Sequence, residues 1–346
     1  MTIVIVGGGA IGLLVAGRLA QASQPVALLV RPKTSAALKT QPLAIKQAGQ
    51  TQKISNLLAK TEITELPLAY QHPQLAILCV KGYATSEALP TLLSLQPKTI
   101  LTLQNGLGHE ETLANALGKE KIIAGVITSS VDIESATSIT VTKVGGIGLA
   151  RLSDSLNIAP TAALLRSGAF RITEYADYRA LKWSKVLLNM LGNATAALLD
   201  LPVDAIYADQ RLVELEQRAF QEALAVMKTL HIRPVNLPGY PVIPLAFLMQ
   251  KFPTKGVAWV LRGFAARGRG GKIPSLQQDF QQGKAHSEGA YLYGAIAQAA
   301  EQVGLVAPVN KALWQMLDNL VTGNMAKDAF RHKPDQLLDF IANSQC

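Results

Sequence analysis

The apolar positions at the start of the chain predict a strand, a turn and a helix. β-branched residues dominate residues 2–6, three glycines follow, and apolar residues then recur with helical spacing over residues 10–22. Short apolar runs of the length of buried strands then alternate with helix-like stretches; the strands are expected at 26–30, 75–80, 100–103 and 122–126, and the clearest helices at 84–95 and 107–117. This alternation predicts an α/β fold built on a mostly parallel, Rossmann-type doubly wound sheet.

The pattern changes in the second half of the chain. Residues 138–143 and 147–150 predict antiparallel strands added at an edge of the sheet, and from about residue 178 strand signals give way to helical periodicity, at 180–200, 208–230, 277–303 and 311–319. Residues 231–275 are rich in Pro and Gly and predict a long connection or lid without regular elements. We therefore expect a Rossmann domain at 1–172 and an all-helical C-terminal domain at 173–346.

The composition agrees with two folded domains and indicates the charge of the molecules that the protein binds. A chain of 346 residues with 49% hydrophobic content can bury a large core, and its net charge of +9 favours anionic partners such as nucleotides, carboxylates, phosphates or nucleic acid. Cys79 and Cys346 lie far apart, which indicates free thiols in a reducing cytoplasm. The apolar N-terminus lacks the basic region of an export signal, and the five dispersed histidines indicate no metal site.

The first turn carries a dinucleotide fingerprint. Its pattern is G-x-G-x-x-G, formed by Gly7, Gly8, Gly9, Ala10, Ile11 and Gly12 between a predicted strand and a predicted helix. In this context the glycines allow a tight turn, close approach of a pyrophosphate and close helix packing. The second strand ends at Arg31 rather than at an acidic residue, which favours the 2′-phosphate of NADP(H). The alternative for Arg31 is an ordinary surface arginine.

Polar residues follow two later strands and recur along one helix. Lys81 and Asn105 stand where open α/β sheets bind ligands, although Asn-Gly pairs are also common in turns. Lys185, Asn189 and Asn193 are spaced by four residues, which places them on one stripe of an apolar helix. That stripe is either a solvated face or a site in which a lysine donates a proton to a carbonyl substrate. Glu288 is the candidate second partner, with an exposed helix carboxylate as the alternative.

Taken together, these segments resemble the ketopantoate reductases (2-dehydropantoate 2-reductases) over nearly the whole chain. The matching motifs are GGGAIG, VKGY, LQNGLG, KWSKVLLN and PSLQQDFQQGKAHSE, in that order. The resemblance implies an NADPH-binding domain, a helical substrate domain and reduction of the C2 carbonyl of a 2-oxo acid. It implies Lys185 as the general acid and Glu288 as the carboxylate that holds the substrate hydroxyl. The other roles it implies are substrate contacts by Asn189, Asn193 and Ser275, nicotinamide-side contacts by Lys81 and Asn105, with Asn105 also near the substrate, and a 2′-phosphate contact by Arg31.

The chain departs from the family pattern on the substrate side. Ala290 and Tyr293 replace a usual acidic residue and a usual asparagine, and Lys272 stands where an asparagine often binds substrate. Lys272 could instead attract a substrate carboxylate. The departures leave the identity of the oxo acid less firmly predicted than the fold, the cofactor and the type of reaction.

Other functions remain to be weighed. The departures keep open a reductase of a different 2-oxo acid and a non-catalytic NADP(H)-sensing protein. Arginines in the Pro/Gly-rich segment invite comparison with nucleic-acid binders, but stacking aromatics are sparse there, and neither nucleic acid nor a membrane is an expected partner. An opine-type dehydrogenase would need a His-based acid/base pair, for which there is no clear candidate. The small residues at 294–300 would permit a homodimer contact, although core packing explains them too.

Overall fold

The computed structural model describes residues 1–55, 57–268, 273–284 and 286–343, and the chain forms two compact units. Unit 1 comprises Met1–Lys182 with Leu237–Tyr240, and unit 2 comprises Trp183–Asn236 with Pro241–Cys346. The division falls inside helix α7 (Tyr178–Met190), which runs from one unit into the other. The expected domain boundary after residue 172 precedes this division, and a short segment from the second half of the chain returns to unit 1.

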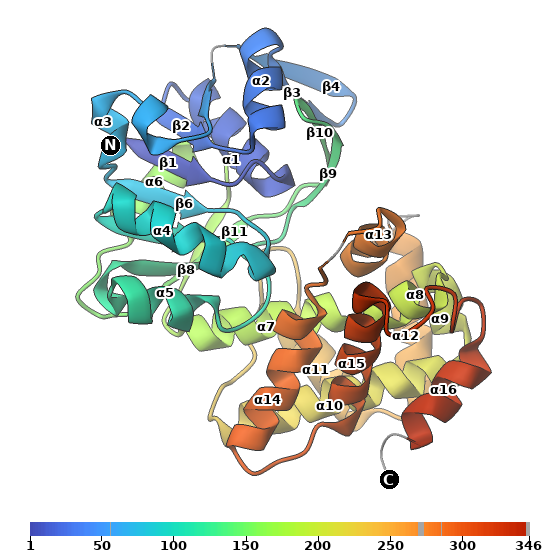
Figure 1. Cartoon of the computed structure of the whole chain (residues 1–346). Helices are drawn as coiled ribbons and strands as arrows, with labels where there is room; N and C mark the ends of the chain where they lie inside the picture. The colour runs from blue at the N-terminus through green and yellow to red at the C-terminus, as the bar shows by residue number, and fades with distance from the viewer. Residues whose placement is uncertain (56, 269–272, 285, 344–346) are drawn as a thin grey trace. The chain divides into compact units, whose positions relative to one another are not determined.

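An eight-stranded sheet forms the centre of unit 1 (Figure 1), in the order β12-β11-β8-β7-β6-β1-β2-β5. Its strands are β1 (Ile3–Val6), β2 (Val26–Leu29), β5 (Leu58–Lys60), β6 (Leu75–Leu78), β7 (Thr99–Thr102), β8 (Ile122–Ile127), β11 (Ile147–Arg151) and β12 (Ile172–Tyr175). Six neighbouring strands of this sheet, in the order β8-β7-β6-β1-β2-β5, are all parallel to one another. They follow the strand order of the Rossmann fold, as predicted. The order reverses at β1, which makes the carboxyl ends of β1 and β6 the expected ligand crevice.

Both faces of this sheet are covered by helices. Alternate residues of β1 point to opposite faces, so that Ile3 and Ile5 join one core cluster and Val4 and Val6 join another. The first cluster includes helices α1 (Ala10–Gln21) and α6 (Ala159–Ser167), and the second includes α4 (Thr85–Leu95) and α5 (His109–Leu117). Because these strands are buried on both sides, they read as continuous apolar runs, which is why the sequence pattern locates them well.

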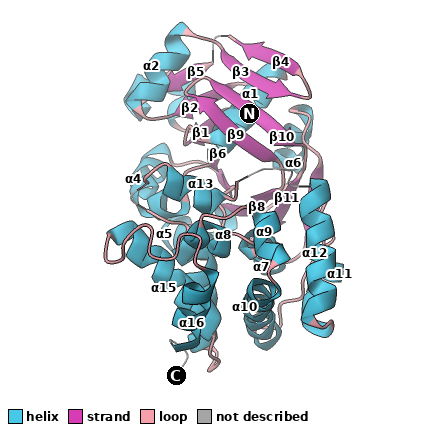
Figure 2. Ribbon diagram, turned by 90° about the vertical axis from the view of Figure 1, so that its right-hand side faces the viewer, coloured by secondary structure: helices cyan, strands magenta, loops and turns pink. Residues whose placement is uncertain are grey.

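A second sheet in unit 1 was not predicted. It has the order β4-β3-β10-β9, with strands β3 (Leu43–Gln47), β4 (Gln50–Ile54), β9 (Ser130–Ser135) and β10 (Ser138–Lys143). Figure 2 shows these strands beside α1, and a side chain at Gly17 would collide with Ile45 of β3, with 2.6 Å between Cβ and Cδ1. The expectation that 138–143 extends an edge of the main sheet was therefore wrong. Residues 147–151 do pair antiparallel with β8, but they are not the edge strand, because β12 pairs with their other side.

The described part of unit 2 is helical. Its helices are α8 (Ala194–Leu199), α9 (Val203–Ala208), α10 (Gln210–Thr229), α11 (Val242–Lys251), α12 (Thr254–Gly268), α13 (Ser275–Gln281), the π-helix η4 (Ala290–Gly294), α14 (Ala295–Gln302), α15 (Pro308–Thr322) and α16 (Pro334–Asn343). The prediction of a connection without regular elements at 231–275 was wrong, because it contains α11 and α12. Pro241 and Pro253 immediately precede these helices, where proline is compatible with helix formation. The single helix expected at 277–303 is also broken.

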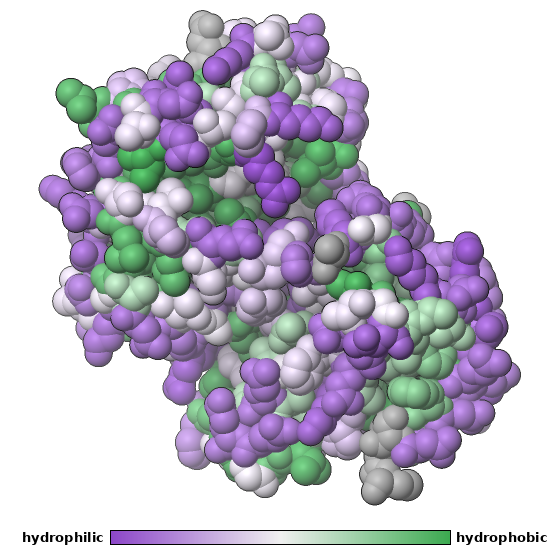
Figure 3. Space-filling model, in the orientation of Figure 1, coloured by the Kyte–Doolittle hydropathy of each residue, from purple (hydrophilic) through white to green (hydrophobic). Residues whose placement is uncertain are grey.

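The remaining short elements connect these layers in unit 1. They are α2 (Pro32–Thr40), η1 (Ile63–Glu65), α3 (Leu68–Gln71), η2 (Gly82–Ala84) and η3 (Lys119–Lys121). On the face shown in Figure 3, hydrophilic side chains cover most of each unit and hydrophobic ones gather in smaller patches. Among the described residues, no helix combines the length and apolar character needed to cross a membrane.

Candidate functional site

Two glycines of the first turn are required by the fold itself. Gly7 follows β1 with a φ of +112°, and a Cβ there would lie 2.9 Å from the carbonyl carbon of Cys79. A Cβ on Gly12 would lie 2.0 Å from the carbonyl oxygen of Gly7. Any larger residue would force β1, β6 and α1 apart. Gly8 is also crowded, since its Cβ would lie 2.7 Å from a methyl carbon of Val30.

Gly9 is different, because the protein leaves the space beside it open. A Cβ there would meet its nearest neighbour, the carbonyl oxygen of Cys79, only at 4.0 Å. Gly9 is the N-cap of the 12-residue helix α1 and has a φ of −76°, which any residue can adopt. The fold alone therefore does not require glycine at this position. Open space before a helix N-terminus, at the strand-order reversal, fits the pyrophosphate of a dinucleotide.

Arg31 lies at the carboxyl end of β2, on the same edge of the sheet. It is the N-cap of α2, and Pro32 is the first helical residue. The Arg31 side chain is exposed. This position fits a phosphate contact and an ordinary surface arginine equally, so its role stays a prediction.

Lys81 and Asn105 follow the adjacent parallel strands β6 and β7. Both are half-buried, and Lys81 is the N-cap of η2. Gly106 has a φ of +92°, so Asn105 does belong to a turn. Turn formation does not exclude a binding role, because β6 pairs with β1 as well and the loop therefore lies at the glycine-turn edge.

A buried polar cluster beneath the Asn105 loop was not anticipated. Lys182, 2% exposed, donates from Nζ to the carbonyl of Gln104 at 2.6 Å and lies 2.8 Å from Oε1 of Glu110, which is 1% exposed. His109 donates from Nε2 to the carbonyl of Asn105 at 2.9 Å. Lys182 lies three residues before Lys185, next to the predicted polar stripe of the same helix, and this additional lysine in an apolar stretch is a signal in the sequence that could have revealed the cluster.

Burial and neighbouring charges shift the pKa values of two groups in this cluster. Burial, together with the positive charge of Lys182, lowers the pKa of His109 to about 4, so the imidazole is neutral at physiological pH. Burial also raises the pKa of Glu110, against the opposing effect of the neighbouring ammonium.

Burial alone raises the pKa of Cys79 to about 12, which makes this free thiol unreactive, and Cys346 lies outside the described residues.

In unit 2, Lys185 and Asn189 stand out along α7. Between residues 180 and 190 these two side chains are partly exposed, and all the remaining residues are buried. A fully solvated face is therefore excluded for the stripe. The prediction that Asn193 continues the same helical stripe was wrong, because α7 ends at Met190 and Gly192 has a φ of +61°. Asn193 instead begins α8 as its N-cap.

Side chains from distant elements satisfy the backbone at this break. The Tyr293 hydroxyl donates to the carbonyl of Met190 at 2.8 Å and accepts from the amide of Ala194 at 3.1 Å. Oε2 of Glu216 accepts from the amide of Gly192 at 2.8 Å. Because Tyr293 and Glu216 are both buried, the break is held by fixed polar groups.

Asn193 also has a structural role at the break. Its Nδ2 donates to the carbonyl of Asn189 at 2.9 Å, and its Oδ1 accepts from the amide of Leu276 at 3.1 Å. Asn193 thus links the ends of α7 and α8 to the first turn of α13, where Ser275 is the first residue.

Glu288 is buried in unit 2, with 3% of its surface exposed, so the alternative of an exposed helix carboxylate is wrong. It lies two residues before the π-helix η4, a type of helical irregularity that is often found at functional sites. Lys272 lies outside the described residues.

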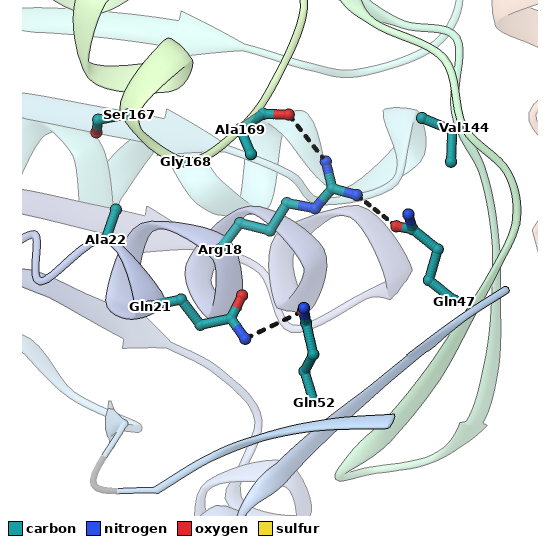
Figure 4. Close-up of a pocket in the computed structure, with 9 residues that line it drawn as sticks. All are labelled: Arg18, Gln21, Ala22, Gln47, Gln52, Val144, Ser167, Gly168 and Ala169. Atoms are coloured by element: carbon teal, nitrogen blue, oxygen red, sulfur yellow. Dashed lines mark hydrogen bonds between the residues drawn. The ribbon is translucent and has the colours of Figure 1, made fainter. Parts of the chain in front are cut away.

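A separate pocket of about 340 Å³ lies in unit 1 near Arg18 (Figure 4). Arg18 donates to Oε1 of Gln47 at 2.7 Å and lies 4.8 Å from the centre of the Phe170 ring. These contacts connect α1 to β3 and to the segment before β12. We interpret Arg18 as a structural link between these elements.

Comparison with known proteins gives matches in both the N-terminal and the C-terminal part of the chain. The family model described as ketopantoate reductase PanE/ApbA matches residues 3–154, and the model of that family's C-terminal region matches residues 177–321. A 2-dehydropantoate 2-reductase of Pyrococcus abyssi is 27% identical over 320 residues, covering 92% of this chain and 97% of that protein.

The fold is shared with solved structures, of which two cover nearly this whole chain. The PanE/ApbA family ketopantoate reductase from Ralstonia eutropha aligns with a TM-score of 0.77 at 22% identity, covering 94% of this chain and 99% of that one. A D-mandelate dehydrogenase in complex with NADH and anilino(oxo)acetate aligns with a TM-score of 0.79 at 19% identity, covering 94% and 100%. The matched models together span both units, and the chain belongs to the ketopantoate reductase family.

Proposed function

We propose that this protein is an oxidoreductase that uses NADPH to reduce ketopantoate, or a closely related branched 2-oxo acid, to the 2-hydroxy acid. The observation that carries the proposal is the space beside Gly9, which the fold leaves open in front of α1 at the strand-order reversal. Membership of a family whose curated relatives are 2-dehydropantoate 2-reductases supports the reaction.

The cofactor is bound by groups along one edge of the main sheet. The backbone from Gly7 to Gly12 faces the pyrophosphate, and the amides of the first turn of α1 donate to it. Arg31 contacts the 2′-phosphate, which gives the preference for NADPH over NADH. Lys81 and Asn105 contact the nicotinamide half, and Asn105 also approaches the substrate. Bound NADPH would supply the hydride.

The chemistry of the oxo acid falls to unit 2. Lys185 donates a proton to the carbonyl oxygen as negative charge develops on it, and its ammonium also attracts the substrate carboxylate. Glu288 accepts a hydrogen bond from the substrate hydroxyl and fixes its orientation. Asn189, Asn193 and Ser275 contribute further substrate contacts, with one side of the Asn193 amide already bonded to the protein.

A second candidate is reduction of a different 2-oxo acid. Ala290 has lost the carboxylate that the family pattern leads one to expect, and the hydroxyl of Tyr293 is bonded to Met190 and Ala194. Both changes alter the polar groups available to a substrate hydroxyl. A series of branched 2-oxo acids with and without a terminal hydroxyl separates this candidate from the first.

The test is the loss of NADPH absorbance that depends on added oxo acid. Wild type should turn over ketopantoate, and Lys185→Ala should reduce kcat by about 10²- to 10⁴-fold with NADPH affinity unchanged. The matched control is Lys311→Ala, which removes an exposed lysine of α15 and should leave kcat unchanged. Arg31→Ala should weaken NADPH binding far more than NADH binding.

Three outcomes would change the conclusion. Turnover by Lys185→Ala equal to wild type would remove Lys185 from the chemistry, and an unchanged ratio of the two coenzymes in Arg31→Ala would remove the phosphate contact. Tight NADPH binding with no turnover of any oxo acid would favour the sensing protein over the reductase.

A further inference from the structure

The backbone carbonyls of the two cofactor-side loops are held from below by buried side chains. The loop after β6 runs through Lys81 and Gly82, and the loop after β7 runs through Gln104 and Asn105. Loop carbonyls that are withdrawn from water must be satisfied, and each of these four accepts a hydrogen bond from a side chain. The four side chains that donate these bonds, Thr85, Gln104, His109 and Lys182, are all buried.

Thr85 is the centre of this support. Its hydroxyl, buried at the start of α4, donates to the carbonyl of Gly82 at 2.7 Å and accepts from Nε2 of Gln104 at 2.8 Å. It also lies 3.1 Å from Nδ1 of His109. Because the single hydrogen of this hydroxyl goes to Gly82 and the Nδ1 of neutral His109 carries none, the approach to His109 is a close contact without its own hydrogen bond. The hydroxyl therefore joins the loop after β6 to the loop after β7 through Gly82 and Gln104.

Gln104 and His109 complete the connection between the loops. The Gln104 amide oxygen accepts from the hydroxyl of Thr102 at 3.0 Å, and its Nε2 also approaches the carbonyl of Lys81 at 3.5 Å. His109, neutral for the reasons given above, holds the carbonyl of Asn105. The two loops are thus joined through the side chain of Gln104, which reaches Thr85 and the Lys81 carbonyl, while His109 and Lys182 hold the carbonyls of Asn105 and Gln104.

We propose that the cluster formed by Thr85, Gln104, His109 and Lys182 positions the two loops so that Lys81 and Asn105 meet the nicotinamide half of the cofactor. The inference rests on the proposed function, because it takes NADPH as the ligand of this edge. Its members are positioning residues, since they bond to loop backbone and act through the residues above it. A rigid support of this kind lowers the entropy lost when the loops bind the nicotinamide.

The adenosine half provides an internal reference. It is held by the glycine turn and by Arg31, and the bonds of the cluster lie in the two loops after β6 and β7. Damage to the cluster should therefore weaken ligands that carry a nicotinamide and leave ligands without one unaffected. A variant that simply unfolds unit 1 would weaken both.

The experiment measures dissociation constants of NADPH and of 2′,5′-ADP for the full chain by calorimetry, together with the fluorescence of bound NADPH. Thr85→Val keeps the side-chain shape and removes the hydroxyl, and it should raise the NADPH dissociation constant about tenfold while that of 2′,5′-ADP changes less than twofold. Thr137→Val is the matched control, because it removes a buried hydroxyl whose bond to Gln41 lies by the second sheet. It should leave both constants unchanged.

A second variant guards against failure of the first to fold. His109→Phe keeps a ring and removes the donor to the Asn105 carbonyl, and it should show the same selective loss with altered nicotinamide fluorescence. The inference is overturned if both variants bind NADPH as tightly as wild type, or if they lose NADPH and 2′,5′-ADP equally. Failure of the proposed function would be seen separately, as absence of NADPH binding by the wild type, and would overturn the inference with it.

Discussion

Two glycines of the first turn should respond in opposite ways to the same added methyl group. At Gly9 the new Cβ would lie 4.0 Å from its nearest neighbour, at a φ of −76° that alanine adopts readily. Gly9→Ala should therefore leave the free energy of unfolding unchanged or raise it by about 0.5 kcal/mol, because alanine restricts the unfolded chain. At Gly12 the Cβ would lie 2.0 Å from a backbone oxygen, and Gly12→Ala should cost more than about 2 kcal/mol.

Nucleotide binding should distinguish the two variants further. The methyl group at Gly9 occupies the space that we assign to the pyrophosphate, so Gly9→Ala should bind NADPH at least about tenfold more weakly, equivalent to about 1.4 kcal/mol. Urea unfolding gives the stability of each variant and titration of NADPH fluorescence gives its affinity. A Gly9→Ala protein that is stable and binds NADPH as wild type would refute the assignment of this space. A Gly9→Ala protein as unstable as Gly12→Ala would refute the packing argument.

Two further predictions concern the buried polar groups. Tyr293→Phe removes the hydroxyl shared by Met190 and Ala194 and should lower the free energy of unfolding by about 2 kcal/mol, measured by urea titration; an unchanged midpoint would contradict it. The pKa of His109 falls from 6.5 to about 4 on folding, because the folded protein disfavours the charged imidazole. The free energy of unfolding should therefore be unaffected by protonation of His109 above pH 6.5 and should fall by about 3 kcal/mol as the pH is lowered from 6.5 to 4. His109→Gln keeps Lys182 and Glu110 but should lose this part of the pH dependence, and parallel stability curves for the two proteins would argue against it.

The sheet core was predictable, and the second sheet was not, for one physical reason. Strands buried on both faces, such as β1 and β6, consist of apolar residues only and are visible as runs. Strand β4 reads QTQKI and is exposed over four of its five residues. A strand of that composition is stable only because β3 pairs with it, and such pairing is not visible in a local pattern.

The helices of unit 2 show the limits of composition. Pro and Gly suggested an irregular segment at 231–275, yet Val242, Ala246 and Met249 share one face of α11 and are buried. Tertiary burial outweighed the weak local preference. Conversely, the periodicity of Lys185, Asn189 and Asn193 suggested one continuous helix. Nothing local marks its end at Met190 except Gly192, whose positive φ matters only in the folded chain.

The candidate site was predictable where chemistry repeats in short motifs, and unpredictable where support comes from afar. The glycine fingerprint and the order of the strand ends place Gly7, Arg31, Lys81 and Asn105 along one sheet edge. The groups that hold the loops and the helix break come from positions up to about a hundred residues distant, as Tyr293 does for Met190. Their bonds depend on tertiary packing that a single sequence does not display.

Tyr293 bears on the choice between a reductase and a nucleotide-sensing protein. As a departure from the asparagine of the family pattern, it left open the loss of substrate chemistry. Its hydroxyl, however, satisfies the backbone beside the break that ends α7, the helix that carries Lys185 and Asn189. The substitution therefore adds support to the helix of the proposed acid. Because the buried Glu288 is retained as well, we infer that the departures modify the choice of oxo acid and leave the capacity for reduction in place.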